Sequence, residues 1–219
     1  MRSRLSVLFL LTACILPLRA HTLRFVAFDF PMSVGACKIT ASGKDAAKEA
    51  KQIELGINRF SAPLELPPGP YQFALPDGKT AELTLTGDAA GKVLVIVLPG
   101  SQGKVALVQV PDQAAAFGAG DRVFINATKV PVRIQLGTVP ISCPAGGNKV
   151  VKALPKSADG RIPVRMWYAR GEEWLKFNST YWPDNQAVRS MVLIFPNPEI
   201  EAPGVKTIEE VPPAERSEP

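Results

Sequence analysis

The stretch from Arg161 to Trp182 reads RIPVRMWYARGEEWLKFNSTYW and contains all three tryptophans and two of the three tyrosines of the chain. Its side chains follow the alternating pattern of two strands on either side of Arg170-Gly171. Glycine supplies the positive φ that a tight hairpin turn requires. The stretch therefore predicts a β-hairpin, and with it an all-β protein.

A two-residue turn at Arg170-Gly171 also determines which side chains share a face of this hairpin. It places Trp167 directly opposite Trp174, and Trp182 has the same parity as Trp174. The other face would carry aliphatic side chains and form the core. We therefore expect an aromatic and cationic strip made of Trp167, Trp174, Trp182, Arg165 and Lys176.

Two interpretations of this strip are open from the sequence. Tryptophan combines a large contact area with a polar N–H, so the strip could bind sugar rings or the apolar patch of a partner protein. Tryptophan is also highly buried on average, and a Trp–Trp pair with Arg165 stacked over it would fill the space between two sheets. The average burial of tryptophan favours the second interpretation.

Residues 1–20 have the pattern of a secretory signal peptide. Two arginines precede an apolar run of 14 residues, Leu5 to Leu18, which is too short to span a bilayer comfortably. Ala20 provides a small residue at the cleavage point. Leu11 to Cys14 resembles a lipoprotein box, so acylation at Cys14 is a second interpretation. We expect an exported protein of the periplasm, cell surface or medium, with no transmembrane segment in the mature chain.

The net charge of the mature chain indicates which partners to expect. Removing residues 1–20 takes three arginines from the 25 lysines and arginines, which leaves 22 against 20 acids and a net charge of +2. Nucleic-acid-binding proteins usually carry a clustered basic patch. We therefore expect no nucleic-acid partner, and instead a protein or a polysaccharide of the cell envelope.

Two cysteines survive cleavage after Ala20, Cys37 and Cys143. In an oxidising compartment they could form a disulfide across a long loop, which would be worth roughly 4–5 kcal/mol. Free cysteines are also common as small buried residues. We favour two free thiols.

A repeated pattern of short strands divides the chain in two. Lys92 to Leu98 (KVLVIVL) is almost entirely apolar and predicts a central strand buried on both faces, and Ser190 to Pro196 (SMVLIFP) repeats it. Pro111 to Gly120 differs in composition, and Asp112 could cap a short helical turn there. This pattern predicts two related units in tandem, and the alternative is one larger sandwich.

We expect each unit to be a small antiparallel β-sandwich of the Ig-like or Greek-key type, which usually needs about 100 residues. The predicted organisation is a signal peptide at 1–20, a first unit at 21–111, a linker at 112–120, a second unit at 121–211 and a disordered tail at 212–219.

Several short motifs carry a resemblance to known proteins. They are the F-x-N strand start at Phe124 to Asn126, the Pro-x-Gly turn at Pro144 to Gly146, and the strand-ending Pro99 and Pro196. The overall pattern resembles a group of uncharacterised secreted bacterial proteins with paired small β-sandwich units, over most of the mature chain. The resemblance implies the fold and an envelope location, and it carries no catalytic residues.

Catalytic and metal-binding patterns are scarce. His21 is the only histidine, and copper sites built on an N-terminal histidine need a second one. Glu172 and Glu173 are adjacent, so on a strand they point to opposite faces and do not form an acid–base pair. We therefore expect no enzyme, no cofactor and no metal site. The expected function is a non-catalytic structural or interaction module, and the alternative is a carbohydrate-binding module that uses the tryptophan strip.

Overall fold

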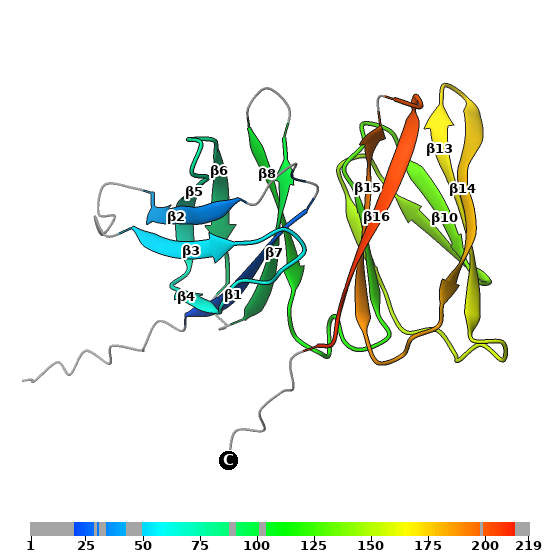
Figure 1. The fold of residues 1–219 in the computed structure, drawn as a ribbon, viewed down its shortest axis with the longest axis horizontal. Coiled ribbons are helices and arrows are strands. Elements are labelled where there is room, and N and C mark those ends of the chain that lie inside the picture. Colours follow the sequence, from blue (N-terminus) through cyan, green and yellow to red (C-terminus); the bar gives the residue numbers. More distant parts are fainter. Residues whose placement is uncertain are drawn as a thin grey trace, which may run out of the picture.

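The computed structural model describes residues 20–28, 30, 34–42, 50–87, 91–100, 104–197 and 199–212. The fold of this part consists of four sheets with four strands each. Figure 1 shows how the sheets are arranged. The predicted all-β class is confirmed. Residues 1–19 of the predicted signal peptide, the segment 43–49 and residues 213–219 of the predicted tail lie outside the described residues.

The first unit contains eight strands in two sheets. Its inner sheet has the order β4-β1-β7-β8 and its outer sheet the order β3-β2-β5-β6. The bounds are β1 (His21–Ala27), β2 (Gly35–Ala41), β3 (Lys51–Leu55), β4 (Leu64–Leu66), β5 (Gly69–Ala74), β6 (Thr80–Leu85), β7 (Lys92–Pro99) and β8 (Val105–Pro111).

The second unit repeats this topology strand for strand. Its inner sheet has the order β12-β9-β15-β16 and its outer sheet the order β11-β10-β13-β14. The bounds are β9 (Arg122–Asn126), β10 (Val132–Leu136), β11 (Val139–Cys143), β12 (Asn148–Val151), β13 (Arg161–Arg170), β14 (Glu173–Pro183), β15 (Arg189–Asn197) and β16 (Ala202–Glu210). The predicted pair of sandwich units is therefore confirmed.

One feature of each inner sheet differs from the prediction. β1 pairs with β7 in parallel, and β9 pairs with β15 in parallel, so the units are not purely antiparallel. Parallel neighbours need a long connection between them. Here the connection passes through the outer sheet of the same unit and back.

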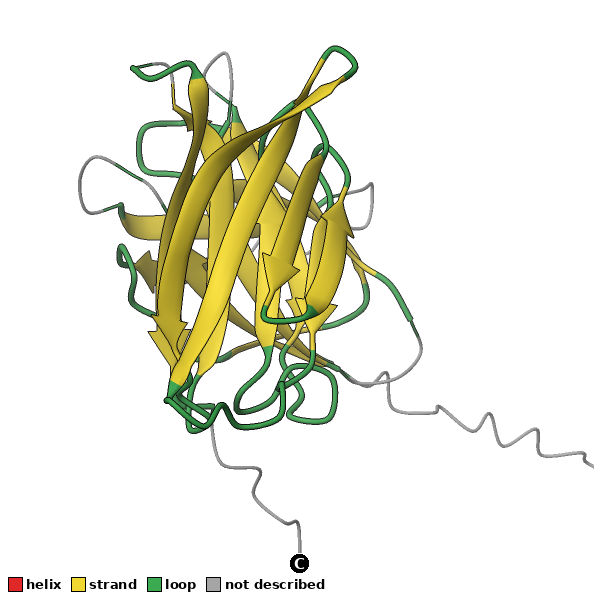
Figure 2. Ribbon diagram, turned by 90° about the vertical axis from the view of Figure 1, so that its right-hand side faces the viewer, coloured by secondary structure: helices red, strands yellow, loops and turns green. Residues whose placement is uncertain are grey.

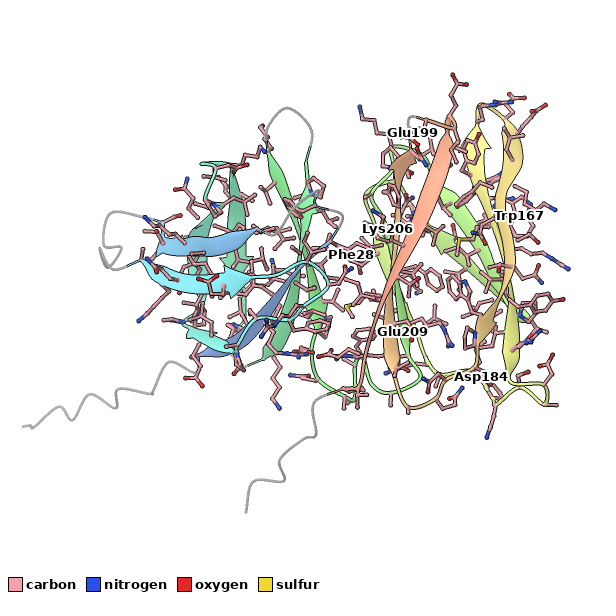
Figure 3. All side chains as sticks on the ribbon, viewed as in Figure 1. Phe28, Trp167, Asp184, Glu199, Lys206 and Glu209 are labelled. Carbon is pink, nitrogen blue, oxygen red and sulfur yellow. The ribbon has the colours of Figure 1, made fainter. Side chains whose placement is uncertain are left out.

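The four sheets stack as layers, and the two inner sheets face each other (Figure 1). Three clusters of buried apolar side chains fill the three spaces between the layers. Phe28 lies in the middle space, between the units (Figure 3). On β7, Val95 and Val97 join the first cluster, whereas Leu94 and Ile96 join the second. The predicted burial of this strand on both faces is confirmed, because its sheet is an inner layer.

The segment between the units contains the predicted short turn, closed by the (i, i+4) hydrogen bond of a single helical turn. The amide of Phe117 donates to the carbonyl of Gln113 over 2.8 Å. The carboxylate of Asp112, just before this turn, pairs with Arg24 and Arg189.

Candidate binding face

The hairpin of β13 and β14 is confirmed, but its predicted register is wrong. Arg170 pairs with Glu173, so the turn consists of Gly171 and Glu172, with Gly171 at φ +62°. Trp167 consequently lies opposite Lys176, and Trp174 lies opposite Ala169. The two tryptophans share a face as diagonal neighbours and are not a directly opposed pair.

A bulge in β14 removes the third tryptophan from this face. The pairing shifts by one residue at Phe177, and an extra residue inverts the parity of everything that follows it. Trp182 therefore pairs with the buried Ile162 and stacks on Phe124, with the ring centroids 6.1 Å apart. Trp182 packs against the core of the second unit, so its predicted place beside Trp174 is wrong.

The outward side chains of the β11-β10-β13-β14 sheet form a surface that we call the basic aromatic face. Figure 2 looks onto this sheet, and Trp167 is labelled on it in Figure 3. Successive residues alternate between this face and the core, where Ile134, Val164 and Met166 are buried. The face comprises Arg133, Gln135, Pro140, Ser142, Arg161, Pro163, Arg165, Trp167, Ala169, Trp174, Lys176, Ser179, Tyr181 and Pro183.

The strand register arranges this face in rows. One row runs across the four strands as Ser142, Arg133, Trp167 and Lys176. The next row contains Arg165, which lies two residues before Trp167 on the same strand. Trp167 is thus flanked by a cation on each neighbouring strand and by a third along its own strand. The structure brings together four of the five predicted strip residues and adds Arg133, which the sequence did not indicate.

An open groove of about 630 Å³ crosses the face. Trp167 and Trp174 are half-buried in it, and the guanidinium carbon of Arg133 lies 3.8 Å from the ring centroid of Trp174. An arginine stacked on tryptophan is a cation–π contact, which leaves the edge of the guanidinium free to donate hydrogen bonds. The side chains around the groove include Gln135, Thr138, Pro140 and Ser142.

The face carries an unbalanced charge. Its four strands contain one carboxylate, Glu173, which lies at the hairpin turn. None of the ion pairs among the described residues involves Arg133, Arg165 or Lys176, and all three are exposed. Neighbouring like charges destabilise a sheet slightly. The arrangement therefore suits an anionic partner better than bare solvent.

The equivalent outer sheet of the first unit shows whether the fold requires this kind of surface. The outer sheet of the first unit has the same topology, yet its exposed side chains contain both lysines and glutamates and no aromatic residue. They are Ala36, Lys38, Lys51, Gln52, Glu54, Pro70, Gln72, Thr80, Glu82 and Thr84. The fold itself therefore does not require an aromatic and cationic surface at this position.

The two cysteines lie in different units. Cys37 is buried on β2 between the sheets of the first unit, and Cys143 is buried on β11 of the second. Both are free, which confirms the favoured prediction and contradicts the alternative of a bridge. Burial raises the pKa of the Cys37 thiol to about 11.

His21 lies at the start of β1 and is buried. Neither of its ring nitrogens has a hydrogen-bond partner among the described protein atoms. In the same part of the chain, no group of three or more His, Cys, Asp or Glu side chains is placed to hold a metal ion.

Four charged residues meet where the two units join. Arg24 Nε donates to Asp112 Oδ2 over 2.7 Å, and Arg24 Nη1 donates to Glu210 Oε1 over 2.5 Å. Arg189 also donates to both carboxylates, and its Nη1 donates to the carbonyl of Phe117 over 2.9 Å. We call Arg24, Asp112, Arg189 and Glu210 the junction cluster. The cluster links the two units, because Arg24 lies on β1 and Glu210 on β16. Its two positive and two negative formal charges cancel, so it leaves no net charge for a ligand.

The arginines of the junction cluster also set the pKa of Asp112. Burial acts to raise the pKa of this carboxyl, but hydrogen bonds from Arg24 and Arg189 outweigh it and hold the pKa below its ordinary value. The sequence offered one weak indication of the cluster, namely two arginines placed within or beside strongly apolar strands.

No protein-family model matches the chain, and no curated protein matches its sequence. Within the described part of the chain, no helix has the length and apolar character needed to cross a membrane. The chemistry of the basic aromatic face therefore has to be understood from its own geometry.

Proposed function

We propose that the protein is a non-catalytic, exported binding module that contacts a partner in the cell envelope or outside the cell through the basic aromatic face. The observation that carries the proposal is the groove over Trp167 and Trp174. The cations around it have no acidic partner among the described residues, and the equivalent sheet of the first unit has a plain polar surface. Tryptophan and arginine are enriched at the centres of binding surfaces.

The groups around the groove support binding without catalysis. General acid–base catalysis needs a side chain that gains and loses a proton near the working pH. The described residues that line the groove include no His, Asp, Glu or Cys. They offer aromatic rings, a guanidinium, an amide and hydroxyls, which are groups that hold a ligand in place.

The signal-peptide pattern of residues 1–20 supports the exported location. An exported binding module would meet the polysaccharides and proteins of the envelope as its first potential partners.

A blocking experiment tests the proposed function. Cys37 and Cys143 are buried, so a new surface cysteine can be labelled selectively with a bulky maleimide. We would label Ser142→Cys on the basic aromatic face and Gln72→Cys on the equivalent sheet of the first unit, then measure retention of each mature protein on isolated cell-envelope material.

We expect the label at Ser142 to lower retention at least tenfold and the label at Gln72 to leave it unchanged. Equal retention of both labelled proteins would show that the partner binds elsewhere. No retention of the unlabelled protein would contradict binding in the envelope altogether.

A further inference from the structure

We infer that the partner of the basic aromatic face is an acidic polysaccharide, whose sugar rings stack on tryptophan while its carboxylates pair with the surrounding cations. The inference rests on the proposed function and specifies the ligand of the same site. It follows from the position of Trp167, from the length of the aromatic track and from the unbalanced charge.

Trp167 is at the centre of a triangle of cations. Arg133 and Lys176 lie directly across from it on the two neighbouring strands, at the roughly 5 Å spacing of cross-strand side chains. Arg165 lies two residues away on the same strand, roughly 7 Å along it. A flat ring stacked on the indole would therefore have its negatively charged substituents within reach of a cation on three sides.

The aromatic track extends beyond one sugar ring. Trp174 lies on the hairpin side of Trp167. Tyr181 lies opposite Pro163 in the other direction and is 65% exposed as a residue. Pro163 and Trp167 are four residues apart on β13, which corresponds to about 13 Å of strand. A track of this length, with Arg165 between its aromatic side chains, suits several units of a polymer better than a single sugar.

The cations are available to an anion. Arg133, Arg165 and Lys176 have no acidic partner in the ion pairs among the described residues, and Arg133 stacks on the ring of Trp174. A stacked guanidinium presents its planar fork of N–H groups, which matches a carboxylate in bidentate geometry. Carboxylates of a bound polymer would thus form charge-assisted hydrogen bonds and relieve the repulsion between neighbouring cations.

Single-stranded nucleic acid is the other polyanion that combines stacking with charge. The signal-peptide pattern favours the polysaccharide, because an exported chain works where acidic polysaccharides are found. The binding experiment therefore includes an oligonucleotide as one of the polymers tested.

The test is calorimetric titration of the mature chain, residues 21–219, with four polymers. Polygalacturonate provides sugar rings with carboxylates, and its fully methyl-esterified form provides the same rings without charge. Poly-L-glutamate provides carboxylates without sugar, and oligo-deoxythymidine provides the nucleic acid. We expect binding to polygalacturonate that weakens with added salt, and at least tenfold weaker binding to the other three.

Single-residue variants show which surface of the protein binds polygalacturonate. We expect Trp167→Ala to weaken binding of polygalacturonate at least tenfold and Lys176→Gln to weaken it at least threefold. Lys38→Gln, on the equivalent sheet of the first unit, should leave binding unchanged. Lys176 is exposed, so its variant keeps the test decisive even if Trp167→Ala lowers stability.

The other outcomes separate the two proposals. Equal binding of the esterified polymer, of poly-L-glutamate or of the oligonucleotide would overturn the acidic polysaccharide. Absence of all polymer binding would overturn it as well, while the proposed function would stand if the label at Ser142 still blocks retention on envelope material. Binding of polygalacturonate that none of the face variants weakens would overturn the acidic polysaccharide as the ligand of this face, whereas equal retention of both labelled proteins would overturn the proposed function.

Discussion

Arg189 is the side chain whose loss should weaken the junction of the two units most. It is wholly buried and donates hydrogen bonds to Asp112, to Glu210 and to the carbonyl of Phe117. In Arg189→Met, Arg24 alone would face the buried carboxylate of Asp112 and the half-buried carboxylate of Glu210. One negative charge would then have no compensation, and one carbonyl would lose its donor.

The expected magnitude follows from the burial of this cluster. Removing one partner of a buried ion pair typically costs about 3–5 kcal/mol, because the remaining charge stays buried without its counter-charge. For a chain of this length, each 1 kcal/mol lowers the melting temperature by roughly 2–4 °C. Arg189→Met should therefore lower the melting temperature by roughly 6–20 °C.

Differential scanning calorimetry of the mature chain measures this effect. Because the cluster joins the two units, we also expect the unfolding peak of Arg189→Met to broaden or split. Lys79→Met is the matched control, since it breaks the solvent-exposed pair with Asp77, which water screens. The double variant Arg189→Met with Glu210→Gln restores charge balance and should recover part of the loss. A melting temperature of Arg189→Met equal to that of Lys79→Met would refute this account of the junction.

Three further predictions concern single residues. Asp112 has a lowered pKa in the folded chain, so it stabilises the fold above its unfolded-state pKa, and this contribution is lost as the pH falls through the lower folded-state value. Thermal unfolding from about pH 6 to about pH 2 should therefore show a smaller loss of stability for Asp112→Asn than for the parent chain. Burial raises the pKa of both Cys37 and Cys143, so a thiol reagent at about pH 8 should modify neither in the native chain and both after denaturation; rapid native labelling of either would be inconsistent with its burial. A Cβ at Gly204 would lie 2.5 Å from a ring atom of Phe195, so Gly204→Ala should lower the free energy of unfolding by about 1–3 kcal/mol in urea titrations, and an unchanged midpoint would contradict this contact.

Unbroken apolar runs predicted the inner layers correctly. Lys92 to Leu98 and Ser190 to Pro196 contain too few polar residues for a strand with one solvated face, and both lie in sheets that are covered on each side. The similarity of these two runs also predicted the repeat. Their parallel pairing with β1 and β9 was not predictable, because it depends on a connection that runs through the other sheet.

The predicted register of the hairpin was wrong for a local reason. Either Arg170-Gly171 or Gly171-Glu172 places a glycine in a two-residue turn, and the second choice has glycine first, as type II′ turns do. The bulge at Phe177 has no sequence signature, yet it decides that Trp182 lies in the core. Counting parity along a strand is therefore reliable only up to the first irregularity in its pairing.

The chemistry of the candidate site depends on contacts between distant residues. Arg133 and Trp174 lie 41 positions apart and meet only because β10 and β14 both flank β13. The junction cluster likewise joins residues from both ends of the described chain. Local patterns could predict the strands that carry these residues, but not which of their side chains meet.

The central claim is that Trp167 and the cations around it form the surface that binds the partner. The most direct measurement is the fluorescence of a variant whose sole tryptophan is Trp167, with Trp174→Phe and Trp182→Phe, during titration with polygalacturonate. The fully methyl-esterified polymer, which the same variant should bind at least tenfold more weakly, is the matched control. We expect bound polygalacturonate to shield Trp167 from the quencher acrylamide and to shift its emission to shorter wavelength, while the esterified polymer at the same concentration leaves both unchanged. An unchanged emission and quenching of Trp167 under conditions where calorimetry shows binding would contradict the claim.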